Sequence, residues 1–66
     1  MNMRTSDLIE EYLINYIDFI PASQIKKDLK LSHNGLVKGL RQLSYRNLID
    51  IDFRNTKKYI KLINEV

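Results

Sequence analysis

The first segment of the chain repeats its hydrophobic residues at the spacing of an α-helix. Apolar positions recur three or four residues apart from Leu8 to Phe19, and Asp7 with Glu10 has the spacing of a capping box. We therefore predict a helix over residues 7–19. Its apolar face covers about half of the circumference, more than the roughly 100° that one core requires. The additional apolar surface has two explanations: a generously packed central helix, or a contact with a second copy of the chain.

Pro21 separates this helix from a second, shorter one. Proline disfavours helical backbone at the residue before it and is well suited to a helix start. Ala22, Ile25 and Leu29 follow at helical spacing. The pattern predicts a second helix from Pro21 to about Leu29, followed by a turn at residues 30–31.

A third helix is predicted over residues 34–46. Ser32 is a suitable N-cap, and Gly39 indicates close packing where the second helix crosses the third. The apolar line of this helix is formed by Leu36, Leu40 and Leu43. Asn34–Gly35 is also a strong hairpin signal, but its flanks keep helical spacing and lack strand alternation. Asn47 follows the last periodic residue, where a left-handed cap is favoured.

Beyond Leu48 the hydrophobic period changes to two, which is typical of a half-buried strand. Ile49, Ile51 and Phe53 alternate with acids, residues 54–57 form a polar turn, and residues 58–63 are rich in strand formers. The fold class predicted is mainly α with a small β-hairpin: three helices followed by a two-stranded hairpin, as one domain over residues 1–66. The aromatic residues expected in the core are Tyr12, Tyr16, Phe53 and Tyr59.

Composition limits how such a short chain can gain stability. With 66 residues, no cysteine and one histidine, neither a disulfide nor a zinc site is available, which favours a homo-oligomer. The dimer contact expected from the first helix involves Ile9, Leu13, Ile14 and Ile17. The sequence contains no apolar stretch typical of a signal peptide or a membrane span. We therefore expect a cytoplasmic, nucleoid-associated protein with no membrane partner.

The positive charge is concentrated in the middle of the chain. Residues 1–20 carry one base against four acids, whereas residues 21–48 carry six bases against one acid. A basic centre beside an acidic first segment is expected when one face of a protein meets a polyanion and another does not.

The order of helices, turn and basic hairpin resembles the winged helix-turn-helix family of DNA-binding proteins, especially small prokaryotic, phage or plasmid repressor domains. The resemblance lies in PASQIKKDLKLSHNGLVKGLRQLSYRNLIDIDF and the hairpin after it, about two thirds of the chain. In many members the turn after the third helix has the sequence Gly-Leu-Ile, where this chain has Asn47-Leu48-Ile49. The resemblance implies a homodimeric transcription regulator that places the third helix in the major groove of double-stranded DNA, with the hairpin as a wing on the backbone.

The expected DNA-binding residues follow from the outward face of the third helix and from the hairpin tip. On the helix they are Ser32, His33, Asn34, Gly35, Val37, Lys38, Arg41, Gln42 and Tyr45. On the wing they are Arg54, Asn55, Thr56, Lys57 and Lys58. The helix face is polar and basic without an acid, and Asn, Gln, Lys and Arg are the side chains that read base edges or contact phosphate. Asn34, Gly35, Val37 and Lys38 are the expected base readers, because helix-turn-helix proteins read bases with the start of this helix.

Other function classes find less support in the residues. The chain has no cysteine nucleophile, metal-binding cluster or glycine-rich phosphate loop, so we predict neither an enzyme nor a cofactor. One alternative is a winged-helix module that binds protein, such as a phage or plasmid factor, without significant DNA binding. A nonspecific architectural DNA binder is a further alternative.

Overall fold

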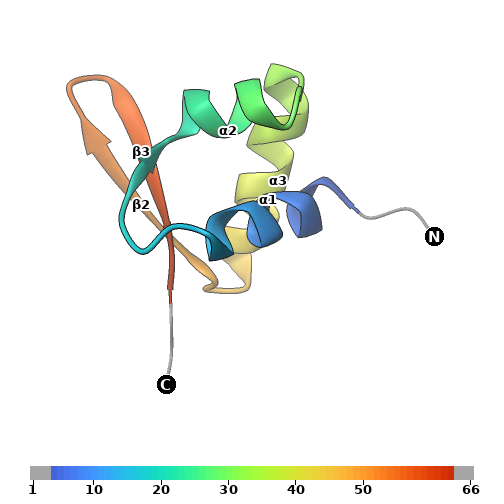
Figure 1. The fold of residues 1–66 in the computed structure, drawn as a ribbon, viewed down its shortest axis with the longest axis horizontal. Coiled ribbons are helices and arrows are strands. Elements are labelled where there is room, and N and C mark those ends of the chain that lie inside the picture. The colour runs from blue at the N-terminus through green and yellow to red at the C-terminus, as the bar shows by residue number, and fades with distance from the viewer. Residues whose placement is uncertain (1–3, 64–66) are drawn as a thin grey trace.

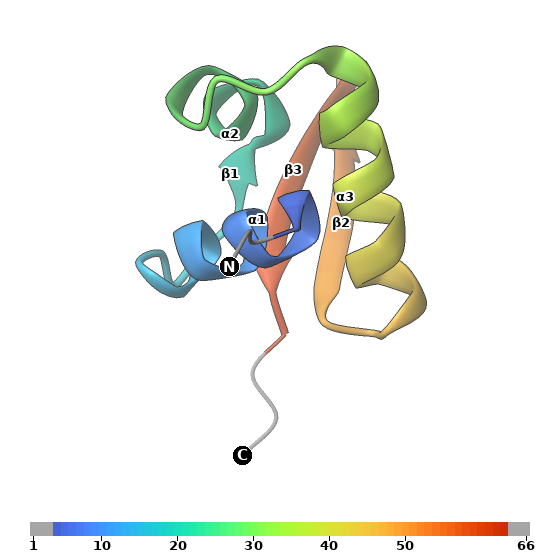
Figure 2. The same ribbon diagram turned by 90° about the vertical axis from the view of Figure 1, so that its right-hand side faces the viewer.

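The computed structural model describes residues 4–63 and folds them into three helices and a three-stranded antiparallel sheet (Figures 1 and 2). The elements in chain order are α1 (Thr5–Ile14), β1 (Ile20–Pro21), α2 (Ala22–Asp28), α3 (His33–Tyr45), β2 (Ile49–Arg54) and β3 (Lys57–Leu62). In Figure 1 the helices lie to the right of the β2–β3 hairpin, so one face of the hairpin is covered and its tip projects at the upper left.

Helix α3 begins and ends close to where its sequence signals place it. The Ser32 Oγ accepts a hydrogen bond from the Gly35 backbone N–H at 3.0 Å, which confirms Ser32 as the N-cap. Asn47 takes the expected left-handed conformation with φ 58°. This conformation lets the Leu48 N–H donate to the Leu43 carbonyl at 3.0 Å and closes the helix end.

Helix α1 is shorter than predicted, because it ends at Ile14 and not at Phe19. Ile20 precedes a proline, which drives its backbone towards the extended conformation, and the chain leaves the helix to reach the sheet. The start of α1 also differs from the prediction. Arg4 stands at the N-cap without a side-chain hydrogen bond, so the capping box of Asp7 and Glu10 does not form.

The sheet has a third strand that the predicted two-stranded hairpin lacked. Strand β1 pairs antiparallel with β3, with Ile20 opposite Ile60 and Pro21 opposite Tyr59, which gives the order β1-β3-β2. Pro21 is tolerated there because β1 lies at the sheet edge. It is also the N-cap of α2, which begins at Ala22, one residue after the predicted helix start.

The hairpin reverses through Asn55 and Thr56, both in the left-handed region with φ 50° and 69°. Two consecutive left-handed residues are the signature of a type I′ turn, whose twist matches that of paired strands. Asn tolerates this conformation well, whereas a β-branched Thr is strained there.

The core lies between the three helices and the inner face of the sheet. The fully buried large side chains come from all of these layers: Ile9, Leu13, Ile25, Leu43 and Ile60. Gly39 is a close-packing site as predicted, but its neighbour is α1 and not α2. A Cβ at Gly39 would lie 2.6 Å from Ile9 Cδ1 and 3.3 Å from Thr5 Cγ2.

Two groups of predicted residues lie elsewhere than expected. Phe53 is 70% exposed and Tyr16 is also exposed, so the prediction that both belong to the core is wrong. Ile9 and Leu13 are buried in the core of the single chain, so they cannot supply the surface of a dimer contact. Of the four residues predicted for that contact, Ile14 and Ile17 remain at the surface.

Candidate nucleic-acid interface

Helix α3 presents a polar and basic face to solvent along its whole length. Its buried side holds Leu36, Gly39, Leu40 and Leu43. The predicted contact residues that stand exposed are Ser32, His33, Asn34, Lys38, Arg41, Gln42 and Tyr45, while Gly35 and Val37 are half-buried. Because α3 contains no acid, nothing on the helix itself offsets the charges of Lys38 and Arg41.

A hollow of about 240 Å³ separates this face of α3 from the hairpin. The side chains that line it come from both elements: Val37, Leu40, Arg41, Ser44 and Tyr45 from α3, and Ile51 and Lys58 from the strands. The structure therefore brings Lys58 beside Arg41 and Tyr45, although 13 or more residues separate them in the sequence. Two cations face one concave surface at this point, which suits a phosphate backbone.

A second hollow, of about 320 Å³, lies on the other side of α3. Its lining is formed by Arg4, Thr5, Gly35, Lys38, Gly39 and Gln42. Arg4 thus joins Lys38 and Gln42 on this side of α3, although it was not among the contact residues predicted from the sequence. The packing of α1 against Gly39 determines this placement, and no local motif in the sequence indicates it.

The hairpin tip separates its predicted contact residues into two groups. Asn55, Thr56 and Lys57 are exposed at or beside the turn, and half-buried Lys58 lines the hollow beside α3. Arg54 instead belongs to the opposite face of the sheet, as does Lys57, its partner across the strands. The Nε of Arg54 donates to Asp52 Oδ2 at 2.8 Å, and this hydrogen bond raises the pKa of Arg54.

The guanidinium of Arg54 also covers two aromatic rings on that outer face. Its Cζ lies 4.9 Å from the ring centroid of Tyr59 and 5.4 Å from that of Phe19. Cation–π contacts of this geometry hold a side chain in place. Arg54 therefore connects the hairpin to the segment before β1, and it does not join Lys58 at the α3 hollow.

Phe53 is the residue of this region whose burial was predicted wrongly from the sequence. It alternates with Ile49 and Ile51, as predicted, and lies directly opposite Lys58 in the β2–β3 register. The hairpin extends beyond the helices at this point, so Phe53 remains 70% exposed where the pattern predicts burial. An exposed aromatic ring thus accompanies the cations of the hairpin, while Tyr45, 81% exposed, accompanies those of α3.

A hydrogen-bond cluster holds α2 against α1 behind this surface. The Tyr12 hydroxyl donates to Asp28 Oδ2 at 2.5 Å and accepts from Gln24 Nε2 at 3.1 Å. Desolvation, followed by the hydrogen bond to Asp28, raises the pKa of Tyr12 above its ordinary value. The cluster positions α2, and through the turn after it the start of α3.

The described part of the chain does not contain the elements of a metal centre. Among residues 4–63, no three His, Asp or Glu side chains gather closely enough to hold an ion. Asp52 is paired with Arg54, and Asp50 lies opposite Lys61 across the strands.

Comparisons of the chain with known protein families, with curated proteins and with solved structures found no match. Within residues 4–63, the structure has no helix of the length and apolar character that crossing a membrane requires.

Proposed function

We propose that this protein binds double-stranded DNA as a winged helix-turn-helix domain, with α3 in the major groove and the β2–β3 hairpin as the wing. The observation that carries the proposal is the exposed face of α3, which is basic, free of acids and continuous through a hollow with Lys58 of the hairpin. An α-helix fits the major groove, and a projecting basic hairpin can reach the adjacent backbone or minor groove. The additional strand β1 lies at the far edge of the sheet from β2 and leaves this surface free.

The residues divide between base reading and backbone contact by their place on this surface. Asn34, Val37 and Lys38 stand in the first half of α3, where base edges are read. Arg41 and Lys58 meet at the hollow and contact one phosphate strand. Arg4 lies on one flank of the surface, where it neutralises a further phosphate.

The experiment that tests the proposal is a fluorescence-polarisation titration of labelled duplex DNA at several salt concentrations. If Arg4, Lys38, Arg41 and Lys58 each neutralise one phosphate, the slope of log K against log salt is about −3.6. Lys38→Ala and Arg41→Ala should each weaken binding and reduce the steepness of the slope by about 0.9. Lys30→Ala is the matched control, because Lys30 is an exposed lysine in the turn before α3 and lines neither hollow beside it.

The outcome of this titration separates the proposal from its alternatives. Undetectable binding at low salt would contradict it and would favour the protein-binding module. Binding that random duplex competes away equally well would favour an architectural role over a sequence-specific transcription regulator.

A further inference from the structure

The two most exposed aromatic side chains of the protein border the same hollow. Tyr45 is 81% exposed and lines the hollow between α3 and the hairpin, and Phe53 is 70% exposed. Phe53 lies directly opposite Lys58 across β2 and β3. Facing residues of two antiparallel strands point to the same side of the sheet, so the Phe53 ring stands on the side where Lys58 lines the hollow. The hollow therefore has one ring at its helix side and one at its hairpin side.

These two rings lack the kinds of contact that hold the other aromatic side chains. The other four aromatic residues are held by hydrogen bonds or by a cation above the ring: Tyr12, Tyr16, Phe19 and Tyr59. Within residues 4–63, neither kind of contact is found at Tyr45 or Phe53. A single exposed apolar side chain is ordinary, but two beside one concave surface indicate an interaction site.

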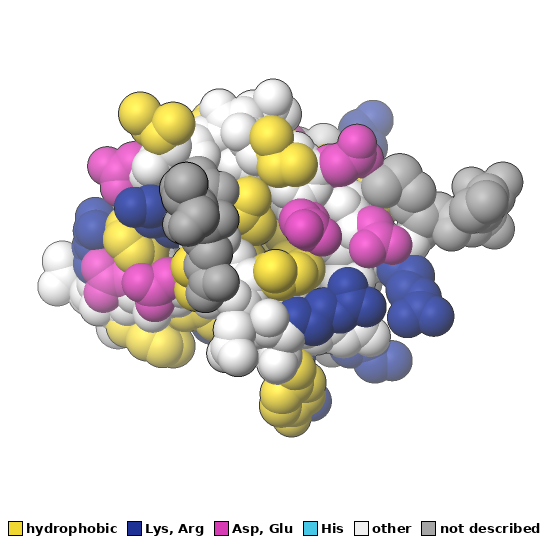
Figure 3. Space-filling model, turned by 90° about the horizontal axis from the view of Figure 1, so that it is seen from below, with side chains coloured by type: hydrophobic (Ala, Val, Ile, Leu, Met, Phe, Trp, Pro, Cys, Tyr) yellow, Lys and Arg dark blue, Asp and Glu magenta, His cyan; other side chains and the backbone are white. Residues whose placement is uncertain are grey.

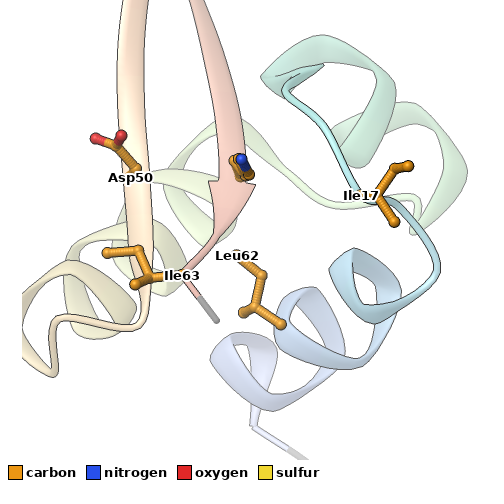
Figure 4. Close-up of a pocket in the computed structure, with 5 residues that line it drawn as sticks. Ile17, Asp50, Leu62 and Ile63 are labelled. Atoms are coloured by element: carbon orange, nitrogen blue, oxygen red, sulfur yellow. The ribbon is translucent and has the colours of Figure 1, made fainter. Parts of the chain in front are cut away.

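The charge of this hollow suits a nucleic acid. Arg41 and Lys58 line it, and none of its lining residues is an acid. A larger hollow, of about 360 Å³, lies at the end of β3, where Figure 4 shows Ile17 on one side and Asp50 and Ile63 across from it. Figure 3, which views the protein from this end, shows acidic side chains beside the hydrophobic ones. That end carries acids, whereas the hollow beside α3 combines two cations with two exposed rings.

We propose that the hollow between α3 and the hairpin takes up unpaired bases of the bound DNA. Tyr45 and Phe53 stack on these bases, while Arg41 and Lys58 contact the phosphates that join them. Stacking on an aromatic side chain is open to every base, because every base has a flat face. The inference rests on the proposed DNA binding and specifies its preferred ligand, which is a duplex that continues into a single strand.

An intact duplex offers these rings a poorer match. Its bases are stacked on one another, so a protein ring reaches a base face only if the stack opens or the base leaves it, at a cost in free energy. A nucleotide that is already unpaired removes this cost. A single strand alone, in contrast, has no major groove for α3. The ligand that satisfies both the helix and the rings therefore has double-stranded and single-stranded parts.

Fluorescence polarisation with three labelled probes tests this preference: a blunt duplex, the same duplex with a single-stranded extension, and the single strand alone. The extension should tighten binding by wild type at least about 5-fold, and the single strand alone should bind more weakly than the extended duplex. Tyr45→Leu and Phe53→Leu should each weaken binding of the extended duplex at least about 5-fold and affect the blunt duplex less. The double variant should bind both duplexes equally.

Two controls separate stacking from a general loss of apolar surface or of the fold. Ile17→Ala should leave the preference unchanged, because Ile17 is exposed at the other end of the molecule. Tyr45→Trp should retain the preference, because indole also stacks on bases. The chain has no tryptophan of its own, so fluorescence of the Tyr45→Trp variant reports on this position alone, and the extended duplex should quench it more than the blunt duplex. Circular dichroism of all variants should match wild type.

Three results would overturn the inference: equal wild-type affinity for the two duplexes, a double variant that keeps the preference, or a single strand that binds as tightly as the extended duplex. Equal affinity for the two duplexes would leave the proposed function intact. Absence of binding to all three probes would overturn the proposed function as well.

Discussion

Gly39→Ala should destabilise the protein, although alanine is the better helix former. Relief of the glycine penalty in α3 is worth about 1 kcal/mol in favour of folding. The new methyl group, however, would stand 2.6 Å from Ile9 Cδ1, about 1 Å inside the usual carbon–carbon contact distance. Ile9 is completely buried, so its side chain cannot turn out into solvent to relieve this contact.

Overpacking of this kind costs about 1–3 kcal/mol. Once the helix gain is subtracted, we expect Gly39→Ala to lower the free energy of unfolding by up to about 2 kcal/mol. Urea denaturation followed by circular dichroism measures this change. Gly35→Ala is the matched control in the same helix, because a Cβ there meets only Ser32 Oγ, at 3.2 Å, and a shift of a few tenths of an ångström relieves that contact without breaking the N-cap hydrogen bond at 3.0 Å. Gly35→Ala should be neutral or stabilising by up to about 1 kcal/mol. A Gly39→Ala protein more stable than wild type, as helix propensity alone predicts, would refute the described contact between α1 and α3.

Three further predictions follow from the hairpin and the α1–α2 contact. Thr56→Gly should raise the free energy of unfolding by about 1 kcal/mol in thermal melts, since Thr56 is held at φ 69°; a loss of stability would contradict the type I′ turn. Phe53→Ala should leave the melting temperature nearly unchanged, because Phe53 is exposed, yet weaken duplex binding if the ring packs in the minor groove; unchanged affinity would remove Phe53 from the interface. The pKa of the Tyr12 hydroxyl is higher in the folded chain than in the unfolded chain, so the unfolded chain loses this proton at lower pH. The stability that Tyr12 contributes is therefore complete below about pH 10 and is lost as the pH rises further. Tyr12→Phe should flatten that alkaline decline in pH-dependent melts, and a decline as steep as that of wild type would assign it to other groups.

The elements that the sequence predicts well are those with signals at both ends. Helix α3 has Ser32 before it, a line of leucines along it and Asn47 after it, and each of these residues acts locally. Helix α1 has no comparable stop signal. Tyr16, Ile17 and Phe19 continue its helical spacing, but a pairing with β3, some 40 residues away, takes the chain out of the helix.

The candidate site shows the same division between local and tertiary information. Exposure of Lys38 and Arg41 follows from the helical period alone. The separation of Arg54 from Lys58 depends on which face of the hairpin each side chain occupies, and the position of Arg4 depends on where α1 begins beside α3. The exposure of Phe53 depends on how far the hairpin extends past the helices, which strand alternation cannot indicate.

The most direct test of the proposed DNA surface is an NMR titration of the ¹⁵N-labelled chain with duplex DNA. We predict that the largest amide shifts occur at Asn34, Lys38 and Arg41 of α3 and at Lys58 of the hairpin. The outer sheet face, marked by Tyr59 and Lys61, should change little. Shifts that concentrate on the outer sheet face while the α3 amides remain unchanged would contradict the account.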